Sequence, residues 1–275
     1  MQSYGFFDYK YNIEGFDSDL FSPMHIVYII LVYLLGFGGS YLLRNTKRES
    51  VSRGLKILSI IMPVLEVCKI TWESCYDITT GQGFNYGGIL PLYTCSLFMY
   101  ALICAAWGRG KLREYCLSFI ATVGLLFGAI GVVYCNGLNY YPFWTFGAFY
   151  SLFFHSAMFI TGVFLLFSGY KRLEWADCLR AMIPILALAV VAVPFNYIYN
   201  HAAGSNADYM LLYSGGGVPI YQDISEKLAQ KGLRFVYTII MLLTHIPLAA
   251  LVVCMYKLIT KAPVRKEKHE TRPMN

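Results

Sequence analysis

Three charged residues lie inside the second long apolar stretch of the sequence. Glu66, Lys69 and Glu73 share one face of a helix, and Asp77 extends that face by one further turn. Each charge at membrane depth costs about 2.5–3.5 kcal/mol on insertion scales, so we expect this stripe to face the protein interior or a water-filled cavity. Two interpretations stay open, a self-neutralising structural ion cluster and a functional site.

Further polar side chains are expected at a similar depth in other helices. At about 1.5 Å per residue from the outer helix ends, Cys95 lies about 10 Å deep, Lys69 about 12 Å and His155 about 13 Å. His245 lies about 15 Å deep and Asn196 about 5 Å on the same count. This convergence predicts one polar cavity that opens to the outer side or to the outer leaflet and is lined by the second, third, fifth, sixth and seventh helices. The alternative is that these residues are tightly packed against one another.

Two kinds of chemistry fit such a cavity. In nucleophilic acyl chemistry Cys95 would be the nucleophile and His155 the general base and then acid, with a carboxylate orienting the imidazole. In a binding protein or proton-coupled transporter of a small polar solute, the charged stripe would act as a relay and the histidines as switches. A metal site is not expected, because no two histidines lie at i,i+3 or i,i+4 and Lys69 would repel a cation. No cofactor is indicated.

The candidate substrate-binding residues are His25, Glu66, Lys69, Glu73, Tyr93, Asn196, Tyr209 and His245. For His25 an ordinary position at the membrane interface is also open, because it follows the helix start predicted at Ser22 and Pro23.

The composition indicates a membrane protein. Of the 275 residues 57% are hydrophobic and 14% charged, whereas a soluble domain carries about 25% charged residues. Long apolar runs predict an all-α polytopic membrane protein with seven transmembrane helices. The runs are 24–43, 55–77, 88–107, 115–134, 146–168, 181–199 and 235–258. Glycines at 124, 128 and 131 in the fourth run suit close helix packing.

The basic residues set the expected orientation. Threading seven helices alternately places 17 of the 22 Lys and Arg residues on one side, which indicates an outside N-terminus and a cytoplasmic C-terminus. The expected parts are an outer-surface segment 1–20, one transmembrane domain 21–260 with an outer loop at about 200–234, and a basic cytoplasmic tail 261–275.

The same charge distribution bears on location and partners. The first 20 residues are acidic and lack an apolar stretch, so we expect no signal peptide and insertion through the first helix. The net charge of +6 is spread over the ends of the helices on one side, which argues against nucleic acid as a partner. Membrane lipids and a small-molecule or lipid substrate are the expected partners in a cell membrane, and the sequence leaves the oligomeric state open.

The eight cysteines are scattered without metal-binding spacing. Cys75 and Cys135 both fall near the expected outer surface, so a disulfide between them stays open.

Several short motifs, taken in order, resemble the YwaF-type family of bacterial integral membrane proteins. They are Phe21-Ser22-Pro23-Met24-His25, Leu90-Pro91-Leu92-Tyr93-Thr94-Cys95, His155, and Asn196 followed by Asp208-Tyr209-Met210-Leu211 and Pro219-Ile220-Tyr221. The resemblance spans about residues 20–260. That family is similar to the eukaryotic transmembrane-protein-164 acyltransferases. The resemblance implies a compact helical bundle with a lipid-facing cavity, and the eukaryotic relatives transfer polyunsaturated acyl chains between phospholipids with a Cys and a His.

The chain departs from these patterns at three positions. Tyr93 stands where the bacterial pattern has a His, Leu92 where the eukaryotic pattern has its Cys, and Asp208 where an Asn is usual. Cys95 follows Leu92 by one turn and can face the same cavity. His155 therefore matches the resemblance better than Cys95 does.

Overall fold

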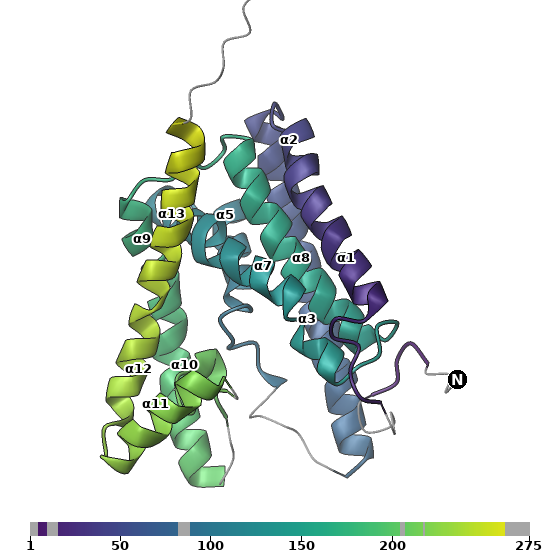
Figure 1. Cartoon of the computed structure of the whole chain (residues 1–275), viewed down its shortest axis with the longest axis vertical. Helices are drawn as coiled ribbons and strands as arrows, with labels where there is room; N and C mark the ends of the chain where they lie inside the picture. The colour runs from purple at the N-terminus through teal and green to yellow at the C-terminus, as the bar shows by residue number, and fades with distance from the viewer. Residues whose placement is uncertain (1–4, 10–15, 82–88, 204–206, 217, 262–275) are drawn as a thin grey trace, which may run out of the picture.

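The computed structural model describes residues 5–9, 16–81, 89–203, 207–216 and 218–261. Predictions for the other residues, which include most of the basic tail 261–275 and half of the segment 1–20, lie outside this part of the chain. Helices make up 76% of the structure, and the described residues form no strand. The long helices run along the long axis of the molecule, and α13 ends at the opposite end from the start of α1 (Figure 1).

Five helical stretches are long and apolar enough to cross a membrane. They consist of α1 (Pro23–Leu34) with α2 (Ser40–Leu42), α6 (Gly110–Phe119) with α7 (Leu125–Val133), α8 (Phe146–Phe167), α9 (Ala176–Arg180) with α10 (Met182–Ala203), and α12 (Arg234–Leu243) with α13 (His245–Lys261). Single π-helical turns, Leu35–Gly39 and Ile120–Gly124, join the first two pairs.

The other two predicted spans correspond to α3 (Arg48–Thr79) and α5 (Leu97–Trp107). The helix α3 has 32 residues and carries the charged stripe, whereas α5 has 11 residues and is about 16 Å long. Val64 and Val67 are exposed on α3 while Glu66 is buried, so the charged face of this helix is turned inward. The helix α3 packs on α5 and α8.

The third span differs from its prediction. A helix was expected from residue 88, but residues 90–96 form turns and α5 begins only at Leu97. Pro91 has no N–H and disfavours helical backbone at Leu90. The Leu90 N–H donates instead to the Tyr209 hydroxyl at 3.0 Å. Irregular backbone at membrane depth is tolerated where it is buried in protein or lines a cavity. The segment 90–96 is therefore a candidate wall of a cavity.

Glycines bring α7 directly onto α8. A Cβ atom at Gly128 would overlap the backbone nitrogen of Phe159, and one at Gly131 would overlap the ring of His155. The sequence prediction of close packing at these glycines is confirmed. The contact fixes the face of α8 that carries His155.

The described part of the N-terminal segment packs over the end of the bundle where α3 ends and α8 begins. The Trp72 indole N–H donates to the Phe7 carbonyl at 2.9 Å, and Asp19 Oδ2 accepts the Phe143 N–H at 2.7 Å. Tyr9 is buried against these groups. This packing places the segment against α3 and the α7–α8 link.

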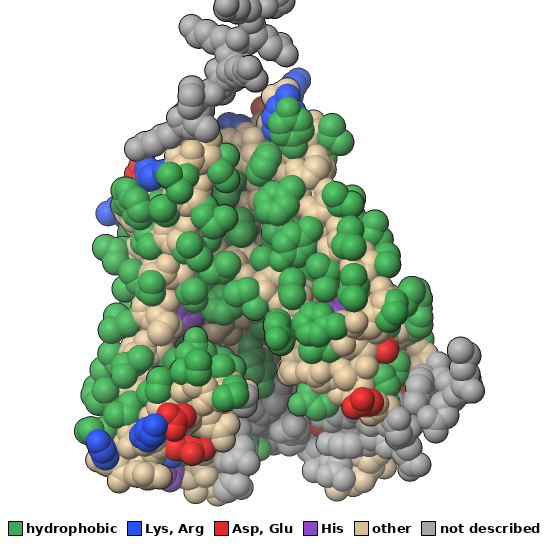
Figure 2. All heavy atoms as spheres, in the orientation of Figure 1, with side chains coloured by type: hydrophobic (Ala, Val, Ile, Leu, Met, Phe, Trp, Pro, Cys, Tyr) green, Lys and Arg blue, Asp and Glu red, His purple; other side chains and the backbone are tan. Residues whose placement is uncertain are grey.

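Apolar and charged side chains occupy different parts of the surface. Figure 2 shows hydrophobic side chains over the middle of one face, with Lys and Arg beside the end of α2 and charges of both signs at α11 (Pro219–Gln230). The helix α11 lies within the stretch 200–234 that the sequence analysis expected to be an outer loop.

Candidate functional site

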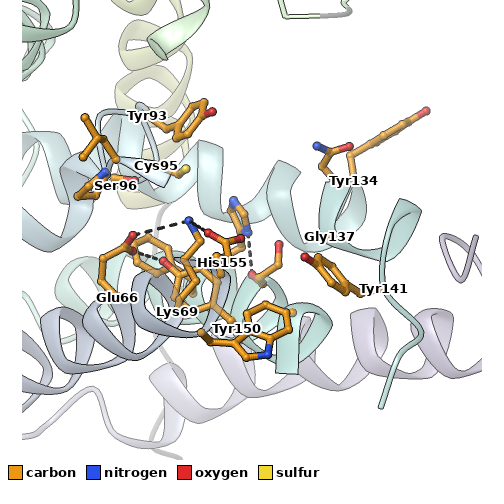
Figure 3. Close-up of a pocket in the computed structure, with 18 residues that line it drawn as sticks. Glu66, Lys69, Tyr93, Cys95, Ser96, Tyr134, Gly137, Tyr141, Tyr150 and His155 are labelled. Carbon is orange, nitrogen blue, oxygen red and sulfur yellow. Dashed lines mark hydrogen bonds and ion pairs between the residues drawn. The ribbon is translucent and has the colours of Figure 1, made fainter. Parts of the chain in front are cut away.

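A cavity of about 350 Å³ lies between α3, the turns at 90–96, the α7–α8 link and the first half of α8 (Figure 3). Of the residues singled out in the sequence, six line it: Glu66, Lys69, Glu73, Tyr93, Cys95 and His155. Three elements far apart in the chain therefore supply one site.

The charged stripe of α3 forms a connected network on one wall. Lys69 Nζ lies 2.9 Å from Glu73 Oε2 and 4.0 Å from Glu66 Oε1. The Tyr150 hydroxyl donates a hydrogen bond to Glu66 Oε2, and Glu66 is only 4% exposed. The stripe faces the protein interior, as expected from the insertion cost of its charges.

His155 is held in one tautomer by its own helix. Its Nδ1 lies 2.8 Å from the Ser151 carbonyl oxygen, one turn earlier on α8 (Figure 3). A carbonyl oxygen only accepts, so Nδ1 carries the proton and Nε2 of the neutral ring keeps its lone pair. His155 can therefore accept a proton at Nε2 and return it.

Cys95 sits in the last turn before α5. In the described chain neither its N–H nor that of Ser96 donates to a backbone carbonyl, and both lie within reach of the Cys95 sulfur. Free N–H groups at a helix N-terminus stabilise an anion, and a thiolate gains in the same way. Removal from water and the nearby Glu66 carboxylate oppose ionisation of the Cys95 thiol, whereas these two N–H groups and the Lys69 ammonium favour it.

The thiol and the imidazole lie on separate walls of the cavity. Within the described residues no hydrogen bond joins Cys95 to His155. A reacting group bound in the cavity would lie between the two side chains, with the sulfur on the α5 side and Nε2 on the α8 side (Figure 3).

The other four residues from the sequence analysis lie away from the cavity. His25 is fully buried and joins α1 to α7, because Nδ1 accepts the Phe21 N–H at 3.0 Å and Nε2 lies 2.9 Å from the Val132 carbonyl. The Ser22 cap predicted for this helix is confirmed, since its hydroxyl accepts the His25 N–H at 3.3 Å. His25 therefore holds the beginning of α1 in place.

Asn196 and Tyr209 form a layer behind the turns at 90–96. The Asn196 side chain accepts the Tyr209 N–H and donates to the Tyr209 carbonyl, both at 2.9 Å. The Tyr209 hydroxyl accepts the Leu90 N–H, and its ring lies 4.8 Å from that of Tyr93. Burial raises the pKa of Tyr209, so this hydroxyl stays neutral. The pair positions the irregular backbone that presents Cys95.

His245 is buried where α12 meets α13. Its Nδ1 lies 3.1 Å from the Met241 carbonyl, its ring packs 5.7 Å from Phe127, and its Nε2 has no partner in the described chain. The helices α10, α12 and α13, predicted as the sixth and seventh spans, thus contribute no lining residue, and the α7–α8 link with Tyr134 and Tyr141 takes their place. The sequence analysis placed these residues in the cavity by their depth alone. Depth along a helix does not determine the direction in which a side chain points.

Among the lining residues that the sequence analysis did not single out, two bind the charged or catalytic side chains directly. Tyr150 donates to Glu66, and Ser151 supplies the carbonyl that orients His155. The residue type at 151 gave no signal for the second contact, because any residue four positions before His155 in the helix presents a backbone carbonyl there.

Cys75 and Cys135 are both free in the structure. Cys75 is exposed, whereas Cys135 is buried and donates from its sulfur to the Ser151 hydroxyl at 3.2 Å. Cys135 thereby supports the turn of α8 that holds His155.

The model of the TMEM164 family matches residues 20–256 of the chain. This range contains all the residues that line the cavity. No curated protein and no solved structure matches the chain significantly. The role of the cavity must therefore be argued from its own geometry.

Proposed function

Because the chain belongs to the TMEM164 family of membrane proteins, we propose that it transfers or hydrolyses the acyl chains of phospholipids in the cavity between α3 and α8. One observation carries this proposal: a thiol at a helix N-terminus and an imidazole with its Nε2 lone pair free line the same cavity. The short motifs that resemble the YwaF-type branch and its eukaryotic relatives support the same reaction class.

The proposal includes an orientation in the membrane. We assign seven spans by adding α3 and the segment 90–107 to the five apolar stretches, with the N-terminus outside and the C-terminus in the cytoplasm of a bacterial cell. Alternating passage of the chain and the clustering of Lys and Arg beside the end of α2 support it (Figures 1 and 2). The catalytic cavity then opens in the outer half of the membrane.

In the first half-reaction the Cys95 sulfur attacks the carbonyl carbon of a phospholipid ester. The thiol proton is taken up at His155 Nε2, through the bound substrate or a water, because no hydrogen bond joins the two side chains within the described residues. The carbonyl π electrons move to the oxygen, which the N–H groups of Cys95 and Ser96 can stabilise. The ester C–O bond then breaks, and the imidazolium protonates the leaving oxygen to give a lysophospholipid and a Cys95 thioester.

In the second half-reaction His155 Nε2 removes the proton from the acceptor hydroxyl. The acceptor oxygen attacks the thioester carbonyl, the C–S bond breaks, and the thiolate recovers its proton from the imidazolium. A lysophospholipid acceptor gives acyl transfer, and water gives hydrolysis. The Glu66–Lys69–Glu73 network lines the same cavity as Cys95 and His155 and would bind the polar headgroup or orient the imidazole.

The experiment compares turnover of a labelled phospholipid by the purified protein and three variants. Cys95→Ala and His155→Gln are expected to reduce turnover at least about 100-fold, in the range typical of removed catalytic groups. Cys104→Ala is the matched control, because Cys104 lies on α5 outside the cavity. Full activity in Cys95→Ala would refute the nucleophile assignment.

A second candidate is supported by the charge of the cavity. Glu66 and Glu73 face a single lysine, so the network carries one net negative charge when all three groups are ionised. Such a site suits a cation or a proton-coupled solute in a binding protein or transporter.

Uptake into proteoliposomes under a pH gradient distinguishes this candidate from the first. Glu66→Gln would abolish uptake, while Glu226→Gln on the exposed helix α11 would not. Absence of uptake under every imposed gradient would remove the transport candidate.

A further inference from the structure

An apolar groove of about 520 Å³ lies between α2, α3 and α8, toward the basic end of the molecule. Leu43, Val51, Leu55 and Phe164 are among its lining residues. On α3 it begins at residue 50 and ends at residue 58, whereas the catalytic cavity begins at residue 66. The groove is therefore a separate site.

A buried hydroxyl without a partner lines this groove. Ser40 is only 3% exposed, and its Oγ makes no hydrogen bond within the described residues. Buried polar groups are nearly always hydrogen-bonded, because an unpaired one carries its full desolvation cost. A ligand with a hydrogen-bond acceptor at this point in the groove would satisfy the hydroxyl.

Two arginines from distant elements meet beside the groove on one aromatic residue. The Arg48 guanidinium carbon lies 4.8 Å from the Tyr170 ring centroid, and that of Arg113 lies 5.6 Å from it. Arg113 also donates to the Tyr170 hydroxyl. In the part of the chain described, neither arginine forms an ion pair with a carboxylate. Arg48 donates to the Tyr170 carbonyl at 3.4 Å and Arg113 to the Ala105 carbonyl at 3.0 Å, and these contacts leave the positive charges without a carboxylate counterion among the described residues.

The arginine pair is connected to the groove at two points. Arg48 lies one turn before Val51 on the same face of α3, and Val51 lines the groove. The Lys171 N–H donates to the carbonyl of Leu165, another lining residue, at 3.0 Å, which fixes the Tyr170 loop to the groove wall.

We propose that this groove binds one anionic phospholipid from the membrane leaflet at the basic end. The acyl chain occupies the apolar groove, an ester oxygen accepts from Ser40, and the phosphate lies beside Arg48 and Arg113. Guanidinium groups bind phosphate strongly, and basic pockets between helices on the cytoplasmic side are suited to anionic headgroups. This binding is independent of the reaction proposed for the cavity.

The test measures lipid binding to the purified protein in an uncharged detergent by native mass spectrometry. The probes are dioleoyl phosphatidylglycerol and dioleoyl phosphatidylcholine, which have the same chains and differ in headgroup charge. The wild type is expected to bind phosphatidylglycerol about tenfold more tightly. Arg48→Ala is expected to weaken phosphatidylglycerol binding about tenfold, the loss expected for one charge-assisted contact. Phosphatidylcholine binding is expected to weaken less, by about threefold, because its choline cation already offsets the charge of the phosphate.

Two further variants separate a built site from general charge attraction. Arg109→Ala removes the same charge from the same end of the molecule at an exposed position outside the groove, and we expect a change below about twofold at physiological salt. Ser40→Ala is expected to weaken the binding of both lipids about threefold, because both lipids carry the ester oxygen that accepts from Ser40. Equal binding of the two lipids by the wild type would overturn the proposal, as would equal losses in Arg48→Ala and Arg109→Ala.

Discussion

Replacing Tyr150 by phenylalanine removes the hydroxyl that donates to the buried Oε2 of Glu66 and leaves the ring in place. A hydrogen bond to a charged group contributes about 1.5–3 kcal/mol. Water cannot replace it fully, because Glu66 is 4% exposed. The loss corresponds to about a 10- to 150-fold shift in the unfolding equilibrium, and for a chain of this size to a melting temperature lower by about 3–10 °C.

The assay is thermal unfolding of the purified protein in detergent, with Tyr134→Phe as the matched control. Tyr134 lines the same cavity but is 66% exposed, so losing its hydroxyl is expected to change stability by less than about 0.5 kcal/mol. A double-mutant cycle with Glu66→Gln should give a coupling energy of about 1 kcal/mol or more. Equal melting temperatures for Tyr150→Phe and Tyr134→Phe, together with additivity in the cycle, would refute the assigned contact.

Two further substitutions test the surroundings of the site. In Gly131→Ala the new methyl group displaces the His155 ring, and a shift of about 1 Å should reduce phospholipid turnover about 100-fold. The control Gly38→Ala, whose methyl group meets no atom, keeps full activity. Equal activities in the two variants would contradict this positioning. In Asp177→Asn the buried Lys171 ammonium loses the carboxylate that lies 2.7 Å away, so thermal unfolding should report a loss of about 3–5 kcal/mol, and a loss below about 1 kcal/mol would show that the pair is dispensable.

The sequence was sufficient to predict the regions that form helices and one wall of the cavity. Charges are costly in lipid, so the spacing of Glu66, Lys69 and Glu73 required an inward face, and α3 has it. Glycines in a membrane helix allow close helix packing, and Gly131 of α7 contacts His155 of α8.

The remaining features depend on contacts between segments far apart in the chain. Pro91 disfavours helix at Leu90, but the partner that the freed Leu90 N–H finds, the Tyr209 hydroxyl 119 residues away, leaves no trace in local propensity. Asn196 and His245 have the depth of the cavity but face other parts of the bundle. Depth follows from counting residues, whereas the facing direction follows from packing.

Identifying a covalent acyl adduct on the protein tests the central claim most directly. After a brief incubation with a labelled phospholipid and no acceptor, the protein is denatured, digested and mapped by mass spectrometry. The account predicts a hydroxylamine-sensitive thioester on the peptide that contains Cys95, lost in Cys95→Ser and retained in Cys104→Ala. Label on another residue, or undiminished turnover by the Cys95→Ser protein, would contradict it.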